Sequence, residues 1–442
     1  MIVNTIILYL FAITSILYIV HLGFYLIGAS AYDIWQHRRI YTLRKKGIVS
    51  DYAPHITILI PAHNEEKVIA RCLNSVFAST YKNIEVIVVN DASTDATRRI
   101  LSDYSRLQDH GSLRIINKRI NVGKGAGLNY ALRRYVRTEL VMMLDADSVV
   151  MPQAIERAVS YFVDPNVAGV AANVQILNEH TTLSILQKFE HMISYQSKKA
   201  YSITNCDFII GGVASTYRVD TIKSVHFYDT DTMTEDISLS MKVVAKGNKQ
   251  HRIIYGVDVV ALTESVESIR ALFRQRFRWK YGSMQNLYKH RALIGANKPK
   301  YTSMLTVYRL PAAIMTEITL LLLPLTWIYA AYLTISHKSL LLVIGAYLTI
   351  TMYVLVTLWY NNHLRRLERV YLTLYVPVAY FVFYVMDLIQ IFAVIKCMIK
   401  ARDLTEHKNR DSTWISPDRI GGRLAGVTTT TVHTRTIGGA HE

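Results

Sequence analysis

The sequence is poor in cysteine, with three in 442 residues: Cys72, Cys206 and Cys397. They are widely spaced and form no CxxC pair or Cys/His cluster, so neither a disulfide framework nor a zinc site is indicated. This usage suits a catalytic domain in a reducing cytoplasm. The sequence also lacks the GxxxxGK[ST] spacing of a P-loop, and it shows no internal repeat.

Apolar residues and positive charge are both abundant. Hydrophobic residues make up 51% of the chain and the formal net charge is +17. A basic chain can bind nucleic acid, phosphorylated substrates or an anionic membrane surface. Much of the excess positive charge lies beside long apolar segments. This placement favours the inner membrane face, rather than a nucleic acid, as the partner. These basic positions are Arg38, Arg39, Arg44 to Lys46, Lys298, Lys300, Arg365, Arg366 and Lys396 to Arg402.

The first long apolar run covers residues 4–29 and contains no charge, so it is long enough to span a membrane. Ala29-Ser30-Ala31 resembles a cleavage site, which makes a signal peptide the rival interpretation. No Lys or Arg precedes the run, however, and a basic cluster follows it. We therefore expect an anchor at residues 1–30, with the N-terminus outside and the next domain in the cytoplasm of a multi-pass protein of the inner (cytoplasmic) membrane.

Three more apolar segments follow, at about 303–334, 339–360 and 371–398. Three crossings after a cytoplasmic domain would place the basic tail outside, against the positive-inside rule. One segment is therefore expected to be interfacial, re-entrant or otherwise not a simple span, and the sequence leaves open which. Candidate break points are Pro311, Pro324 and Pro377. The last stretch, 421–442, is rich in Thr and Gly and is expected to be disordered.

Between about residues 52 and 262, short apolar runs alternate with amphipathic helical stretches. This alternation predicts an α/β domain with a mostly parallel, doubly wound sheet. The predicted strands are 55–61, 85–91, 113–116 and 140–144. The predicted helices are 65–79, one that starts near 93–95, 124–135 and 237–245.

Two aspartates follow the strand that ends at Leu144, namely Asp145 and Asp147. Ligands bind at the carboxyl ends of strands in open α/β sheets. Two close carboxylates repel each other, and a divalent cation between them and a phosphate explains the pattern best. A solvated loop with incidental aspartates is the alternative.

Other polar groups follow the neighbouring predicted strands. The first strand ends in Pro61-Ala62-His63-Asn64-Glu65-Glu66 and the second in Asn90-Asp91-Ala92-Ser93. Asp91 could accept a uracil imide proton or a ribose hydroxyl proton, and Glu65 could act similarly. Lys124, between Gly123 and Gly125, offers a point charge to a diphosphate. Each of these is also a plausible turn when taken singly.

Two later motifs combine charge with a helix or an aromatic residue. Thr234-Glu235-Asp236 precedes an apparent helix, where acidic residues are favourable, so a simple N-cap is the alternative interpretation. The second motif, Gln275 to Trp279, is a basic-aromatic run of the kind that anchors proteins at a membrane interface. Arg278 could equally clamp a diphosphate, and Trp279 could stack on a sugar ring.

Four of these motifs, in this order, resemble those of the processive family 2 glycosyltransferases, which include cellulose, chitin, hyaluronan and poly-N-acetylglucosamine synthases. The four are Asn90-Asp91-Ala92-Ser93, Asp145-Ala146-Asp147, Thr234-Glu235-Asp236 and Gln275 to Trp279. The resemblance covers about residues 55–282 and is strongest to the poly-β-1,6-N-acetylglucosamine synthases. The stretches Met233 to Ser240 and Trp414 to Arg419 carry the closer likeness. The resemblance implies a GT-A type fold combined with transmembrane and interfacial helices.

The resemblance also implies roles for the matching residues. Asp236 would be the catalytic base, and Asp147 would hold the cation, Mg²⁺ or Mn²⁺. The donor UDP-GlcNAc would contact the early motifs together with residues of the last motif: Pro61, Asn64, Glu65, Asp91, Lys124, Asp145, Asp147, Gln275 and Arg278. The growing polysaccharide acceptor would contact Gly212, Val213, Glu235 and Trp279.

The implied organisation is a cytoplasmic glycosyltransferase domain at 50–282, an interfacial and transmembrane channel region at 283–400, and a basic cytoplasmic tail at 401–442. The lipid bilayer and a small accessory membrane subunit would be the partners. The chain departs from the family in having one apolar span before the domain where many relatives have two. The loop Gly211 to Thr216 also lacks the cysteine of cellulose synthases.

The predicted activity is inverting, processive synthesis of poly-β-1,6-N-acetylglucosamine and its transfer across the membrane. Hyaluronan or chitin synthesis and non-processive transfer to a lipid phosphate are the alternative activities. A non-catalytic membrane scaffold or nucleic-acid binder would leave the placed carboxylates unexplained.

Overall fold

The computed structural model describes residues 2–45, 52–107, 112–177, 181–336, 338, 340–361, 364, 366–400, 419 and 421. The predicted disorder at 422–442 and most of the tail motif at 414–418 lie outside these residues.

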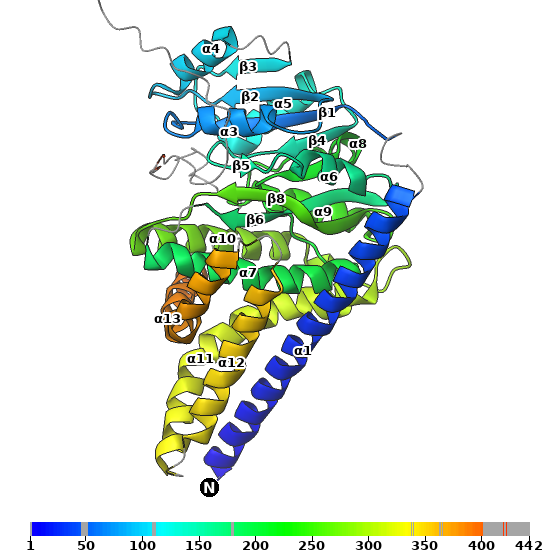
Figure 1. The fold of residues 1–442 in the computed structure, drawn as a ribbon. Helices are drawn as coiled ribbons and strands as arrows, with labels where there is room; N and C mark the ends of the chain where they lie inside the picture. Colours follow the sequence, from blue (N-terminus) through cyan, green and yellow to red (C-terminus); the bar gives the residue numbers. More distant parts are fainter. Residues whose placement is uncertain are drawn as a thin grey trace, which may run out of the picture.

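One eight-stranded sheet forms the centre of the domain, in the order β3-β2-β1-β4-β7-β6-β8-β5 (Figure 1). Strands β3, β2, β1 and β4 are parallel, as are β6 and β8, whereas β7 runs antiparallel to β4 and β6, and β5 antiparallel to β8. This is the mostly parallel α/β sheet that the sequence predicts. The strands are β1 (Ile56–Ala62), β2 (Ile84–Asn90), β3 (Leu113–Asn117), β4 (Leu140–Met143), β5 (Val149–Val150), β6 (Val167–Ile176), β7 (Ser215–Arg218) and β8 (Arg252–Thr263).

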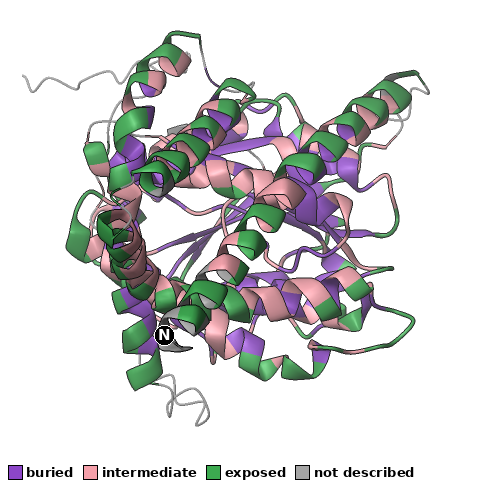
Figure 2. Cartoon of the chain, turned by 90° about the horizontal axis from the view of Figure 1, so that it is seen from below, coloured by how far each residue is buried: buried purple, intermediate pink, exposed green. Residues whose placement is uncertain are grey.

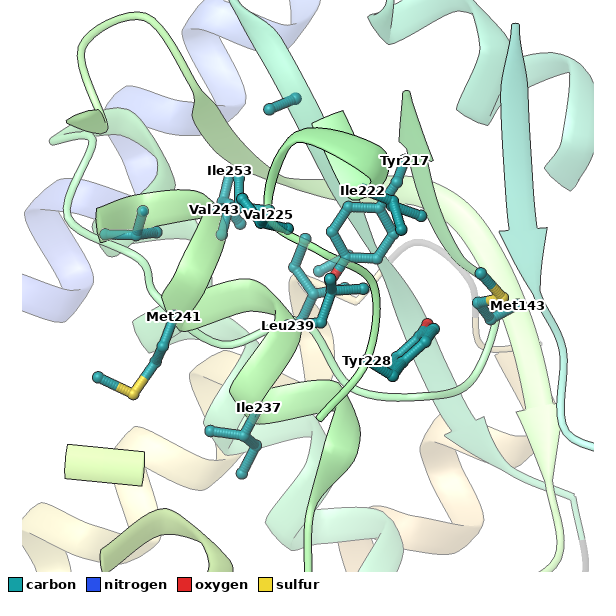
Figure 3. Close-up of a cluster of buried hydrophobic side chains, with 14 of the residues drawn as sticks. Met143, Tyr217, Ile222, Val225, Tyr228, Ile237, Leu239, Met241, Val243 and Ile253 are labelled. Atoms are coloured by element: carbon teal, nitrogen blue, oxygen red, sulfur yellow. The ribbon is translucent and has the colours of Figure 1, made fainter. Parts of the chain in front are cut away.

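Both faces of the sheet are buried. Along β1, Leu59 belongs to one hydrophobic cluster and its neighbours Ile58 and Ile60 to another, because successive side chains of a strand point to opposite faces. Figure 3 shows part of the first cluster, where Tyr217 of β7 packs near Leu239. Helices that contribute residues to these clusters include α3 (Ile69–Phe77), α4 (Thr97–Leu107), α5 (Lys124–Arg134), α6 (Ala154–Tyr161), α8 (Val219–Ser224) and α9 (Glu235–Gly247).

The predicted helix at 65–79 is shorter than expected. Asn64 has a φ of 56°, in the left-handed region, and a turn follows it before α3 begins at Ile69. The chain uses these residues to bring polar groups to the edge of the sheet rather than to extend the helix.

Helix α1 (Ile2–Lys45) extends well past the predicted anchor. Its second half docks on the domain: the Tyr32 hydroxyl donates to the Tyr255 carbonyl, and the Arg39 guanidinium lies 3.6 Å from the centre of the Tyr161 ring. The helix continues through Ala29-Ser30-Ala31, so the stretch that resembles a cleavage site is part of a docked helix.

Helices α7 (Thr182–Ile203) and α10 (Ile269–Lys289) lie beneath the sheet (Figure 1). Below them, a π-helical turn (Met304–Arg309) leads into α11 (Leu310–Ser336), which α12 (Leu341–Trp359) and α13 (Arg366–Ile399) follow. Three helical stretches are long and apolar enough to cross a membrane: Ser15–Leu43, Met304–Ser336 and Arg366–Ile399. Val343–Trp359 is a shorter apolar helix.

Prolines do not end these helices. Pro324 lies inside α11 and Pro377 inside α13, and both helices continue past them. The prediction of a break at either residue is therefore wrong. Neighbouring groups can satisfy the backbone that a proline frees in an apolar helix, so such helices tolerate it.

Helix α13 stays in contact with the domain along its length. Near its start, Glu368 forms an ion pair with Lys188 of α7. Near its end, the Lys396 ammonium lies 4.5 Å from the centre of the Phe277 ring of α10. Figure 1 shows α13 beneath α10, whereas α1, α11 and α12 extend downward from the domain. Seen from below, the nearest helices carry mostly exposed and intermediate residues, and the strands behind them are buried (Figure 2).

Candidate active site

The parallel register brings three strand ends to one edge of the sheet. Ala62 at the end of β1 pairs with Asn90 at the end of β2, and Leu59 pairs with Met143 at the end of β4. The segments that follow these strands carry Glu65, Asp91, Asp145 and Asp147. The structure thus places all four predicted carboxylates at one edge.

Lys124 is the central cation of the site. Its Nζ lies 2.7 Å from Asp145 Oδ1 and 3.2 Å from Glu235 Oε1. Burial opposes the charge of Lys124, but Asp145, Glu235 and Asp236 outweigh that effect and raise the pKa of the ammonium. Burial likewise opposes the charge of Asp145, yet Lys124 holds the pKa of that carboxyl below its usual range, with help from Arg419 and Arg278.

Asp236 lies across Gly212 from this pair. A methyl group at Gly212 would meet Lys124 Nζ at 3.1 Å, Asp145 Oδ2 at 3.4 Å and Asp236 Oδ2 at 3.6 Å. Burial and the neighbouring Glu235 raise the pKa of Asp236 to about 6, even though Lys124 opposes the shift. A carboxylate with this pKa is suited to accept a proton near neutral pH.

Asp147 and Glu65 both contact the side chain of Arg419, which the sequence motifs did not assign to the site. The Arg419 guanidinium lies 2.8 Å from each carboxylate oxygen of Glu65 and 2.5 Å from Asp147 Oδ2. Burial raises the pKa of Asp147 above its usual range, despite the nearby Arg419. Arg419 is far from the site in sequence, and only the likeness of the tail motif marked it as notable.

Asp91 holds the loop that precedes Lys124. Its two carboxylate oxygens accept hydrogen bonds from the amides of Val122 and Gly123, at 3.1 and 2.9 Å. Gly123 has a φ of 86°, which suits glycine, and α5 begins at the next residue. Asp91 therefore positions Lys124 in this structure, in addition to its predicted contact with the nucleoside.

Three other predicted residues have mainly local contacts. Pro61 is buried within β1, and the Asn64 side chain accepts a hydrogen bond from the Thr94 amide at 2.8 Å. Val213 packs partly against the second hydrophobic cluster. These contacts shape the edge of the site.

Helix α10 carries the motif Gln275 to Trp279 and packs closely on the start of α9. A methyl group at Gly282 would lie 2.2 Å from Thr234 Oγ1, so only glycine permits this approach. Arg278 is exposed, and its charge contributes to the lowered pKa of Asp145. Gln275 Oε1 is buried and has no hydrogen-bond partner among the described residues.

Trp279 is 36% exposed, and its ring is held by a neighbour on the same helix. The Arg276 guanidinium lies 4.5 Å from the ring centre and 2.6 Å from Glu190 of α7. Sequence reasoning assigned no role to Arg276, which orients Trp279 from a buried position. An available indole face of this kind is suited to sugar stacking.

The sheet edge that carries these carboxylates suits a divalent cation whose remaining ligands are phosphate oxygens of the substrate. Among the described residues, no group of three or more His, Cys, Asp or Glu side chains is arranged to hold a metal. Mg²⁺ is commonly bound by one or two carboxylates plus phosphate oxygens. Asp147, with Asp145 beside it, supplies such ligands, and the Arg419 guanidinium shows that a cation is stable against Asp147 Oδ2.

Residues 57–224 match the family described as Glycosyl transferase family 2. The chain is 28% identical over 273 residues to a poly-beta-1,6-N-acetyl-D-glucosamine synthase of Staphylococcus aureus (strain COL). This alignment covers 61% of the chain and 65% of the relative. It is 30% identical over 234 residues to the synthase of the same name from Staphylococcus epidermidis, covering 52% and 55%. The matches thus span less than two thirds of these relatives.

The fold is similar to that of mannosyltransferase PcManGT from Pyrobaculum calidifontis, solved in complex with GDP-Man and Mn²⁺. The TM-score is 0.55 at 18% identity, and the alignment covers 86% of this chain and 98% of that one. This likeness confirms the GT-A type fold. Asp236 and α10 lie beyond the region that matches the family.

Proposed function

We propose that the protein is a processive, inverting membrane glycosyltransferase, because residues 57–224 match the family described as Glycosyl transferase family 2. It polymerises N-acetylglucosamine from UDP-GlcNAc into poly-β-1,6-N-acetylglucosamine. The observation that carries this proposal is the position of Asp236 across Gly212 from Lys124 and Asp145, which sets a base beside a group of donor-binding charges.

The donor half of the site is built around charge. Asp147 would hold Mg²⁺ or Mn²⁺, which when bound would offset negative charge on the diphosphate, and Asp145 would contact the nucleotide. Lys124 and Arg278 add positive charge for the leaving group, and Asp91 holds the Lys124 loop while it faces the nucleoside.

The acceptor half supplies the base and a platform for the sugar. Asp236 takes the proton of the acceptor hydroxyl as its oxygen bonds to the anomeric carbon, and the bond from that carbon to the UDP oxygen breaks. One displacement without a covalent sugar–enzyme intermediate inverts the anomeric configuration, so an α-linked donor gives a β-linked product. Trp279 stacks on the terminal sugar of the acceptor, and the buried Gln275 Oε1 accepts a hydrogen bond from the donor.

In the membrane, α1, α11 and α12 cross and α13 lies at the inner interface. The contacts of Glu368 and Lys396 with α7 and α10 support this assignment, since both ends of α13 touch the same domain. Two crossings after the domain return the basic tail to the cytoplasm, as the positive-inside rule requires. The polymer would leave beside the apolar helices, and a small membrane subunit could pack on their exposed faces.

Donor selectivity tests the proposed substrate. The purified protein is supplied separately with UDP-GlcNAc, UDP-glucose and UDP-glucuronate in the presence of Mn²⁺, and UDP release is measured. We expect release with UDP-GlcNAc alone. A further increase in release when UDP-glucuronate is added together with UDP-GlcNAc would instead support hyaluronan synthesis.

A further inference from the structure

Arg419 fills the position beside Asp147 that the proposed function gives to a divalent cation. Its Nε and Nη2 lie 2.8 Å from the two oxygens of Glu65, and its Nη1 lies 2.5 Å from Asp147 Oδ2. The planar guanidinium thus bridges two buried carboxylates, and its own side chain is 13% exposed. This is a built contact rather than a surface ion pair.

The two oxygens of Asp147 are not equivalent. Oδ1 accepts hydrogen bonds from the hydroxyls of Ser148 and Thr263, at 2.8 and 3.5 Å. Oδ2 faces Arg419. A cation that ligates Oδ2 would therefore take the oxygen that the guanidinium holds, and its charge would repel the arginine at close range.

The backbone around Arg419 is also attached to the domain. Lys67 Nζ donates to the Arg419 carbonyl at 3.1 Å. Gly421 has a φ of +62°, and a methyl group there would lie 2.9 Å from Lys67 Cβ. These contacts hold the arginine at the start of α3, beside Glu65.

We propose that Arg419 and the divalent cation compete for Asp147, so that Arg419 occupies Asp147 Oδ2 in the empty enzyme and is displaced when the cation binds with the donor. This inference rests on the proposed function, because it takes Asp147 as the cation ligand. Competition is reciprocal: Arg419 weakens cation binding by the factor by which the cation weakens the contact of Arg419 with Asp147. The chain thereby couples the position of Arg419 to donor loading.

Cation affinity tests the proposal without using activity. Free Mn²⁺ is titrated by electron paramagnetic resonance against the purified full chain without nucleotide. We expect Arg419→Gln to bind Mn²⁺ about tenfold more tightly than the wild type, within the usual range of such coupling. Arg419→Lys, which keeps the charge but cannot bridge both carboxylates, should lie between them. Arg423→Gln removes the same charge from the same tail and should leave the affinity unchanged.

Asp147→Asn separates the two levels of the argument. If it retains the wild-type Mn²⁺ affinity, the cation assignment within the proposed function is wrong. If it loses Mn²⁺ while Arg419→Gln binds no more tightly than the wild type, the competition alone is wrong.

A spin label near Arg419 tests the reciprocal effect, the displacement of Arg419 by the cation. Cys72, Cys206 and Cys397 are buried, so a nitroxide can be attached selectively at Ser416→Cys. Mg²⁺ with UDP should increase the mobility of this label. Unchanged mobility at saturating Mg²⁺ and UDP would overturn the proposal.

Discussion

Asp236 lies within a cluster of charges that act on it in opposite directions. Glu235 and burial raise its pKa to about 6, and Lys124 opposes them. Such shifts are expected where a carboxylate must act as a base near neutral pH. The motifs marked Lys124, Asp145, Glu235 and Asp236 as site residues, and the structure brings these four together; their roles stay predictions. They did not predict Arg419, because no spacing rule links a tail residue to a strand end that is far away in sequence.

Asp236→Asn should lower transfer by about 10²–10⁴-fold, the usual contribution of a positioned base. UDP binding should persist, because the donor-side groups are unchanged. Transfer is measured with labelled UDP-GlcNAc and binding by calorimetry. Near-wild-type transfer would remove Asp236 from the role of base, whereas loss of both properties would indicate a misfolded site.

Transfer should also depend on pH through the same group. A base must be ionised, so the rate at saturating donor should fall about tenfold per pH unit below about pH 6. The profile is measured between pH 5 and pH 8 for the wild type. A rate that stays constant down to pH 5 would contradict a base with a pKa near 6.

The raised pKa of Asp236 has an opposite effect on stability. The carboxyl titrates near 3.8 when unperturbed and near 6 in the folded chain, so the folded state binds the proton more tightly. The stability that this contributes is fully present below about pH 4 and is lost as the pH rises through about 6. Asp236→Asn should therefore raise the unfolding midpoint more at pH 7 than at pH 4.5, measured by intrinsic fluorescence. The exposed control Asp103→Asn should show no such pH dependence; an equal gain for Asp236→Asn at both pH values would argue against the linkage.

At the scale of elements, the strand predictions agree with the structure to within one residue at each end, because continuous apolar runs mark buried parallel strands. The start of α3 was less predictable, since the left-handed Asn64 delays the helix. The close packing of α10 on α9 could not be predicted either. It depends on which residue faces Gly282, and that is a tertiary property.

Gly282→Ala tests this packing. The added methyl group would meet Thr234 Oγ1 at 2.2 Å and force α10 away from α9. We expect destabilisation of about 1–3 kcal/mol together with reduced transfer, since overpacking has costs of this size. Gly345→Ala in α12, where nothing lies within 4 Å of the added atom, is the matched control. Equal behaviour of the two variants, measured by thermal unfolding and transfer, would contradict the proposed role of this contact.

At the scale of the whole molecule, the number of crossings connects the helices to the site. The sequence predicts that one of the last three apolar segments is not a simple span, and we propose that this segment is α13, because its two ends contact the domain. Hydropathy does not single out α13, since it is as long and apolar as a spanning helix. The contact of Arg419 with Glu65 also requires Arg419 to lie on the same side of the membrane as the domain.

Cysteine labelling tests this topology. Lys338→Cys, between α11 and α12, should react with an impermeant maleimide added to intact spheroplasts. Ser412→Cys in the tail should react only after permeabilisation. The buried native cysteines give little background. Labelling of Ser412→Cys from outside would mean that α13 crosses the membrane.

The most direct test of the central claim is the product itself. The purified protein is incubated with labelled UDP-GlcNAc and Mg²⁺ or Mn²⁺, and the product is sized and then digested with linkage-specific hydrolases. A processive β-1,6 synthase should release long polymers while most acceptors are still unextended, and a β-1,6-specific hydrolase should degrade them. Products extended by a single sugar, or a polymer cleaved only by a chitinase, would contradict the account.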